Sequence, residues 1–175
     1  MFDKTSYAAS MRPIERVIAL WRLKFLTDED VIAWADSEIL LSENPPQELF
    51  DLSVEGPGRC VRRAEFEFPA GPVKLPYATE FALRASAVSL ESKDQVLSFI
   101  HWCAQSAMGE ELELPEVAFG YQVEHLLCDC DKPNEAVRYA QAELPTLLPS
   151  LAAVVAPFLE VLPNHSFKRT PNGAA

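Results

Sequence analysis

Helical periodicity interrupted by proline is the feature that most constrains the fold of this chain. Apolar residues recur at spacings of three and four, which places them on one face of an α-helix. The chain also has 14 prolines in 175 residues, and proline favours the first turn of a helix or ends the helix before it. The sequence therefore predicts an all-α fold, an irregular bundle of about seven helices.

Capping patterns set the expected helix boundaries. Pro13 lies at the first turn of a helix whose inward face carries the apolar residues Ile14, Val17, Ile18, Trp21 and Phe25. Thr27 is expected to cap a second helix, because acidic residues in a first turn complement the helix dipole. Further helices are predicted over residues 47–52, 79–88 and 92–109. Three more are predicted to begin at prolines 115, 133 and 149, the last reaching residue 162.

Residues 59–68 lack the helical pattern. Their apolar residues alternate loosely with charged ones, which predicts a short strand, a hairpin arm or an extended crossover. Residues 69–76 contain three prolines and a glycine, typical of a linker. We therefore expect one domain, residues 1–163, whose helical halves at about 12–54 and 77–162 are joined by this linker. Residues 164–175 have no apolar period and are expected to form a disordered tail.

The charge of the chain limits its partners. There are 26 acidic and 15 basic residues, giving a net charge of −11 and a pI near 4.7. Such a field repels nucleic acids and anionic lipid, and favours either solubility or a basic protein partner. The N-terminus lacks the pattern of a signal peptide, and three prolines interrupt the apolar stretch 144–162. We expect a cytoplasmic protein with no nucleic-acid and no membrane partner.

Cysteine and histidine offer the main candidates for chemistry. His125, Cys128 and Cys130 have a spacing seen in zinc sites. On a regular helix, at about 100° per residue, Cys130 lies roughly 140–200° away from the other two. We therefore predict no metal site and four reduced cysteines in apolar surroundings. A thiol nucleophile would use His125 with Cys128. The glycines form no nucleotide-binding motif, so no cofactor is expected.

The candidate binding residues are tryptophans and carboxylates. Trp102 lies about 100° from the apolar stripe of its helix, so it either packs beneath another helix or is exposed. The cluster formed by Arg59, Arg62 and Arg63 is expected to make internal ion pairs, or to hold an anionic ligand. The candidates for protein binding are the two tryptophans and two acidic groups: Trp34, Trp102, Asp28, Glu29, Asp30, Glu110, Glu111 and Glu113.

Two short segments carry a resemblance. Residues 166–172, Ser-Phe-Lys-Arg-Thr-Pro-Asn, resemble the C-terminal tail that a recombination site adds to proteins encoded by integron gene cassettes. Residues 26–36 are similar to segments of small uncharacterised bacterial proteins that include toxin-immunity proteins. Both resemblances imply a bacterial accessory protein.

The functional hypothesis combines this resemblance with the charge. It is an acidic cytosolic protein-binding module, immunity-like or antitoxin-like, that neutralises a basic protein partner. Two alternatives stay open. One is a small hydrolase or transferase that uses His125 with Cys128 or a carboxylate, and the other is an acidic mimic of nucleic acid.

Overall fold

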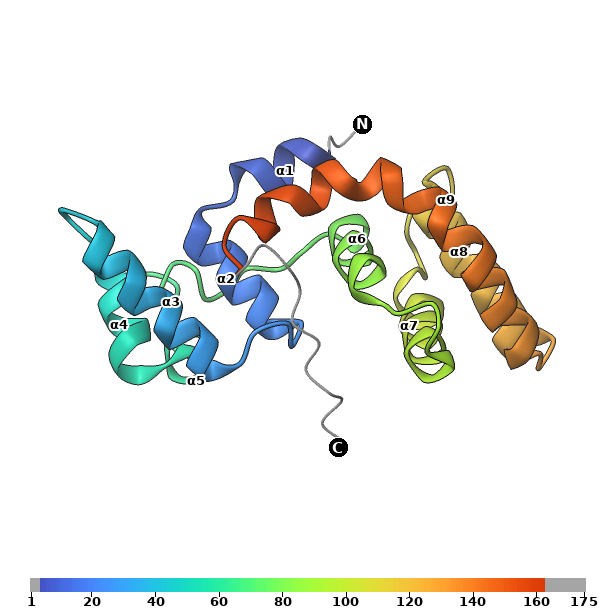
Figure 1. Cartoon of the computed structure of the whole chain (residues 1–175), viewed down its shortest axis with the longest axis horizontal. Coiled ribbons are helices and arrows are strands. Elements are labelled where there is room, and N and C mark those ends of the chain that lie inside the picture. The colour runs from blue at the N-terminus through green and yellow to red at the C-terminus, as the bar shows by residue number, and fades with distance from the viewer. Residues whose placement is uncertain (1–3, 163–175) are drawn as a thin grey trace. The chain divides into compact units, whose positions relative to one another are not determined.

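The computed structural model describes residues 4–162, and side chains from residue 7 onward. These residues form nine α-helices, one π-helical turn and no strand (Figure 1). The expected all-α class is confirmed, with nine helices in place of about seven. The elements are α1 Lys4–Ser10, α2 Pro13–Arg22, α3 Asp28–Leu41, α4 Gln47–Glu55, α5 Pro57–Cys60, α6 Tyr77–Ala87, α7 Lys93–Ser106, α8 Pro115–Glu124, η1 His125–Asp129 and α9 Pro133–Leu159.

The chain folds into two compact units. Unit 1 comprises Met1–Ala8 and Leu75–Ala156, and unit 2 comprises Ala9–Lys74 and Pro157–Ala175. Helices α1 and α9 therefore contribute residues to both units. The expected tail, 164–175, lies outside the described residues.

Most of the expected helix starts are confirmed. Helices α2, α8 and α9 begin at Pro13, Pro115 and Pro133, where the missing N–H of proline costs no helical hydrogen bond. Thr27 caps α3 as expected, because its Oγ1 accepts a hydrogen bond from the Asp30 amide at 3.1 Å. The Asp30 carboxylate accepts the Thr27 amide in return, also at 3.1 Å.

The strand expected at 59–68 was wrong. Helix α5 ends at Cys60, and the chain continues in turns in which the Arg63 amide donates to the Cys60 carbonyl at 3.1 Å. Phe66 and Phe68, two residues apart, would share one face of a strand. Instead Phe68 is fully buried and Phe66 is 86% exposed. The loose alternation of apolar and charged residues in this segment therefore reflects turns that bury single residues, and not a strand.

A helix boundary expected at Pro149 was also wrong, because α9 runs without interruption from Pro133 to Leu159. Pro145 and Pro149 are both exposed, so the carbonyls that they leave without a helical donor can be hydrated. Buried residues on the opposite face, such as Leu144 and Leu151, hold the helix in place. In the described part of the chain, α9 is the one helix long and apolar enough to cross a membrane, a test that core helices of soluble proteins also pass.

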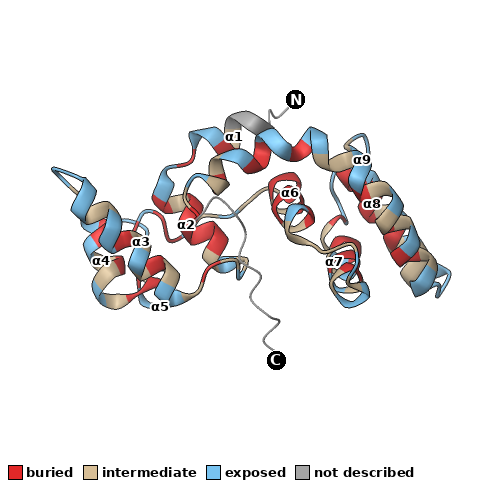
Figure 2. Ribbon diagram, viewed as in Figure 1, coloured by how far each residue is buried: buried red, intermediate tan, exposed pale blue. Residues whose placement is uncertain are grey.

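Unit 1 is built around aromatic rings. Most residues of α6 are buried (Figure 2), and the ring of Phe81 lies 5.4 Å from that of Phe99 and 5.6 Å from that of Phe119. Gly120 in α8 lets that helix approach α7 closely. A Cβ atom there would lie 2.5 Å from the Cβ of Ala107 and 2.8 Å from the hydroxyl of Tyr77. Any larger residue would push α8 away from this core.

We predict that Gly120→Ala destabilises the protein by about 1–3 kcal/mol, a typical cost of overpacking. This cost should exceed the gain in helix propensity, about 1 kcal/mol. Chemical denaturation monitored by circular dichroism measures it. Gly58→Ala is the control, because a Cβ there meets no atom closer than 4.0 Å. Equal stability of the Gly120 variant and the wild type would contradict the packing argument.

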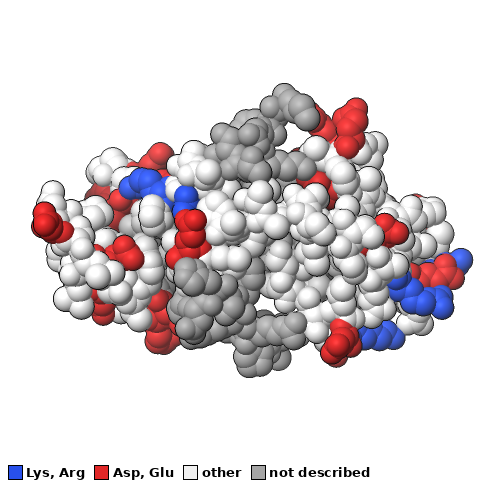
Figure 3. Space-filling model, turned by 45° about the horizontal axis from the view of Figure 1, so that its top comes forward, with Lys and Arg blue, Asp and Glu red and all other residues white. Residues whose placement is uncertain are grey.

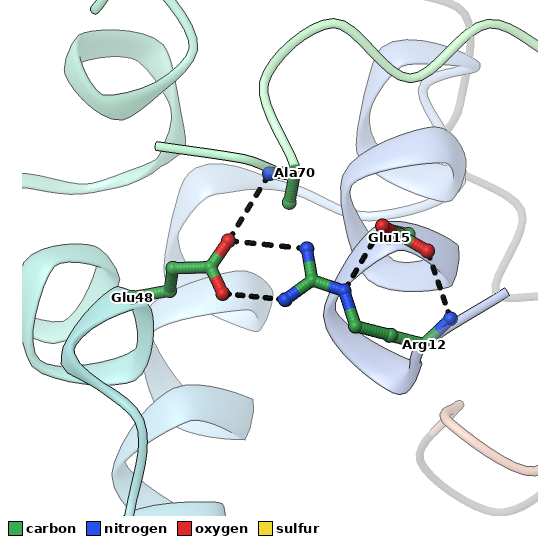
Figure 4. Close-up of polar contacts among 4 residues, drawn as sticks. All are labelled: Arg12, Glu15, Glu48 and Ala70. Carbon is green, nitrogen blue, oxygen red and sulfur yellow. Dashed lines mark hydrogen bonds and ion pairs between the residues drawn. The ribbon is translucent and has the colours of Figure 1, made fainter. Parts of the chain in front are cut away.

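Unit 2 depends on the carboxylate of Glu48, a residue that is only 8% exposed (Figure 4). It accepts two hydrogen bonds from the Arg12 guanidinium, at 2.7 and 3.3 Å, and one from the Ala70 amide at 3.1 Å. Arg12 also donates to Glu15 at 3.0 Å. Hydrogen bonding to Glu48 raises the pKa of Arg12, so the guanidinium stays charged. The network ties the start of α4 to the start of α2 and to the turns before residue 75.

We predict that Glu48→Ala lowers the free energy of unfolding by about 1–3 kcal/mol, because the buried amide of Ala70 loses its acceptor. Thermal or urea denaturation measures the change. Glu43→Ala, at an exposed carboxylate, is the control and should stay within about 0.5 kcal/mol of wild type. If the two variants were equally stable, the Glu48 network would not hold α4.

Candidate functional site: an acidic helical hairpin and a thiol cluster

Helices α3 and α4 pack against each other and are joined by five residues, 42–46. A connection of this length is typical of two antiparallel helices. Figure 1 shows them side by side. The Ser53 hydroxyl of α4 donates a hydrogen bond to the Asp36 carboxylate of α3. We call residues 28–55 the acidic hairpin.

The acidic hairpin contains no lysine or arginine. Its nine carboxylates are Asp28, Glu29, Asp30, Asp36, Glu38, Glu43, Glu48, Asp51 and Glu55. Arginines from elsewhere in unit 2 pair with three of them, because Arg12 contacts Glu48, and Arg63 contacts Asp51 at 2.8 Å and also Glu55. By contrast, no ion pair with another described residue is found for Glu29, Asp36, Glu38 and Glu43. On the face shown in Figure 3, acidic side chains, in red, are scattered among residues that are neither acidic nor basic, in white.

The same hairpin exposes large apolar side chains. Leu40 is 85% exposed, Leu41 79% and Val54 82%, and Phe50 is partly exposed. The buried positions of α3 are Val31 and Ala35, so Leu40 and Leu41 fall outside its inward stripe. Phe50 and Val54 are four residues apart and share one face of α4. Neighbouring exposed apolar residues with a polar surround are typical of interaction surfaces.

The predicted acidic residues have different surroundings. Asp28 accepts a hydrogen bond from the Trp21 indole at 2.7 Å, and Asp30 completes the cap of α3, so these two carboxylates support the fold. Glu29 is exposed. The second acidic group, Glu110, Glu111 and Glu113, is exposed in the loop between α7 and α8, beside Met108 and Leu112, each 61% exposed. That loop belongs to unit 1 and the hairpin to unit 2.

Both candidate tryptophans are half-buried. Trp34 lies on α3 of the acidic hairpin. Trp102 stacks on Tyr77 of α6, with ring centroids 5.5 Å apart, and the Arg84 guanidinium lies 4.8 Å from its ring. Trp102 therefore packs beneath another helix, which is one of the two placements that the sequence left open.

Of the three candidate arginines, Arg63 makes the internal ion pairs expected from the sequence. Arg59 and Arg62 are exposed. No ion pair joins either of them to another residue in the range 4–162.

Cys130, His125 and Asp129 form a cluster in unit 1, here called the thiol cluster, that the sequence did not predict. The η1 turn is π-helical, and the Cys130 amide donates to the His125 carbonyl five residues earlier, at 3.0 Å. This brings the Cys130 Sγ to 3.5 Å from the His125 Nε2. The Asp129 carboxylate lies 2.9 Å from the Nδ1 of the same ring. The prediction that Cys130 lies far from His125 was wrong, because it assumed a regular α-helix and this turn is π-helical.

The four cysteines fall into two classes. Cys60 and Cys103 are buried, as expected, and burial raises the pKa of the Cys60 thiol to about 11 and that of Cys103 well above its usual value. Cys128 and Cys130 are exposed, so the expectation of apolar surroundings was wrong for both. Within the described residues, no group of three or more His, Cys, Asp or Glu side chains has the arrangement of a metal site.

Sequence reasoning missed the apolar part of the hairpin. The sequence does show that residues 28–55 contain no basic residue, but only the burial of Val31 and Ala35 shows that Leu40 and Leu41 lie off the inward stripe of α3. Comparisons with protein-family models, with curated proteins and with solved structures found no match. What this chain does is therefore inferred from the geometry, burial and charge of its side chains.

Proposed function

We propose that this protein is an acidic protein-binding module, and that its hairpin takes up a basic, amphipathic segment of a partner protein. The observation that carries this proposal is the set of exposed apolar side chains, Leu40, Leu41 and Val54, on helices that carry carboxylates and no cation. Burial of the apolar groups would supply affinity. The carboxylates would attract a basic partner and speed its association.

An amphipathic helix suits this surface best. Such a helix presents apolar residues at spacings of three and four, which match side chains displayed on neighbouring helical turns. Phe50 and Val54 have this spacing. Lysines and arginines on either side of the apolar stripe would meet Glu38 and Glu43, which have no ion-pair partner among the described residues.

The specific form of the proposal is neutralisation of a basic partner, as immunity proteins and antitoxins do. The segment that resembles toxin-immunity proteins, residues 26–36, includes Trp34 and the first nine residues of α3. That segment is therefore part of the acidic hairpin, and the resemblance and the surface chemistry point to the same helix.

The loop between α7 and α8 is the competing surface. It combines Glu110, Glu111 and Glu113 with exposed Met108 and Leu112. It offers fewer apolar groups, and they lie in a loop rather than on packed helices. A surface held rigid by packing loses less conformational entropy on binding, so the hairpin is the stronger candidate.

We predict that Leu41→Ser with Val54→Ser weakens binding of a synthetic amphipathic helix of leucine and lysine by tenfold or more, about 1.4 kcal/mol. Both residues are exposed, so stability should change by less than about 0.5 kcal/mol each. Isothermal titration calorimetry measures the affinity. The matched control is Met108→Ser with Leu112→Ser, which should bind as wild type does. Loss of binding in the control alone would move the site to the loop.

We also predict that Glu38→Lys with Glu43→Lys slows association with the same peptide and flattens its salt dependence, with little change in dissociation rate. These two carboxylates are better targets for charge reversal than Asp28 and Asp30, which accept hydrogen bonds within the fold. Stopped-flow fluorescence measures the rates. Charge reversal at Glu110, Glu111 and Glu113 is the control. A folded hairpin variant that associates at the wild-type rate in low salt would refute electrostatic steering.

A further inference from the structure

A thiol, an imidazole and a carboxylate lie in one chain of contacts at the end of helix α8. The Cys130 Sγ is 3.5 Å from the His125 Nε2, and the Asp129 Oδ2 is 2.9 Å from the His125 Nδ1. In this order the carboxylate orients the ring, and the far nitrogen can take the proton of the thiol. A nucleophile, a base and a group that orients the base are the parts needed to activate a thiol.

Access to solvent separates Cys130 from the buried cysteines. Cys60 and Cys103 have no exposed surface, so no reagent reaches them in the folded protein. Cys130 and Cys128 are both exposed, and they are only two residues apart. No hydrogen bond joins the Cys128 thiol to any residue between 4 and 162, so Cys128 is a close control for the effect of the imidazole.

We propose that Cys130 is a reactive thiol, activated by His125 and positioned through Asp129, that undergoes reversible S-thiolation by small neutral or cationic disulfides. The thiolate is the reacting form of cysteine, and transfer of its proton to His125 leaves a thiolate beside an imidazolium. Asp129 stabilises that imidazolium by its contact with Nδ1. The proposal is independent of protein binding at the hairpin of unit 2.

The exchange step balances without an added oxidant. The Cys130 thiolate attacks one sulfur of the small disulfide, forming a new S–S bond as the original S–S bond breaks. The departing thiolate takes the proton held by His125. One protein thiol and one disulfide thus become one mixed disulfide and one small thiol, and an excess of small thiol reverses the reaction.

The surroundings favour disulfide exchange over acyl transfer. The cluster lies at the C-terminal end of α8 and η1, where the carbonyl groups and the negative end of the helix dipole are directed. Such an end offers no N–H donors to a developing oxyanion, whereas disulfide exchange needs none. The neighbouring carboxylates of Glu124, Asp129 and Asp131 would slow anionic reagents, which is why the proposal specifies neutral or cationic disulfides.

The test compares two variants of the full chain, each with only one of the two exposed cysteines. Cys128→Ser leaves Cys130 exposed, and Cys130→Ser leaves Cys128 exposed. Each variant is incubated at neutral pH with cystamine, a cationic disulfide, and with oxidised glutathione, an anionic one. The rate of mixed-disulfide formation is followed by intact mass, the site is mapped by peptide mass spectrometry, and circular dichroism checks the fold. Addition of a small thiol should restore the original mass.

We expect Cys130 to react with cystamine about tenfold or more faster than Cys128, a threshold set below the roughly 100- to 10,000-fold that general-base assistance typically supplies. Oxidised glutathione should react more slowly than cystamine at Cys130. Adding His125→Gln to the Cys128→Ser variant should remove the advantage of Cys130. Asp129→Ala should reduce it, and Asp129→Asn should restore part of it, a rescue that a purely structural role would not produce.

Two results would overturn the proposal. One is equal reactivity of Cys128 and Cys130 towards cystamine, and the other is an advantage of Cys130 that survives the loss of His125. The comparison of the two cysteines does not require a change at His125 or Asp129. The proposal therefore stays testable even if those variants fail to fold.

Discussion

The orientation of α4 depends on one buried carboxylate. Glu48 lies at the start of that helix and is held by two hydrogen bonds from Arg12 and one from the Ala70 amide (Figure 4). Because a helix turns by about 100° per residue, fixing Glu48 inward also fixes the sides on which Phe50 and Val54 emerge. Both then lie on the outside. The side on which α4 exposes Phe50 and Val54 is thus tied to where the one buried acid of the hairpin finds its partner, and loss of that partner would disturb this side of α4 as well as the fold.

The hairpin's charge carries a cost within the free protein. The nine carboxylates of the hairpin, which has no basic residue of its own, repel one another. Arg12 and Arg63 offset this repulsion at Glu48, Asp51 and Glu55, near the side of α4 that faces the rest of unit 2. The remaining charge is left on the outer parts of the hairpin. A basic partner would relieve that repulsion and stabilise the folded state by mass action, so partner binding and the stability of unit 2 should rise together.

Local rules explain both what the sequence predicted and what it missed. Proline at a first turn and Thr27 as a cap act within a few residues, so these helix starts were predictable. The turns after Cys60 and the continuity of α9 through Pro149 depend on contacts with distant residues, which no local pattern records. At the candidate sites, the sequence supplied the carboxylates and the histidine. It did not predict that Leu40 and Leu41 are exposed, because exposure depends on which face of the helix the rest of the unit covers.

The π-helical turn shows how a small change in winding decides which side chains meet. His125 and Cys130 are five positions apart in the chain, and on an α-helix they would lie roughly 140° apart. In the π turn the hydrogen bond spans five residues, and the Cys130 amide bonds to the His125 carbonyl at 3.0 Å. The two side chains then emerge on the same side, and Asp129 reaches the other ring nitrogen. Straightening the turn into an α-helix would separate the thiol from the imidazole while leaving both residues exposed. The reactivity proposed for Cys130 therefore depends on the backbone of this one turn, and not on the presence of cysteine and histidine close together in the sequence.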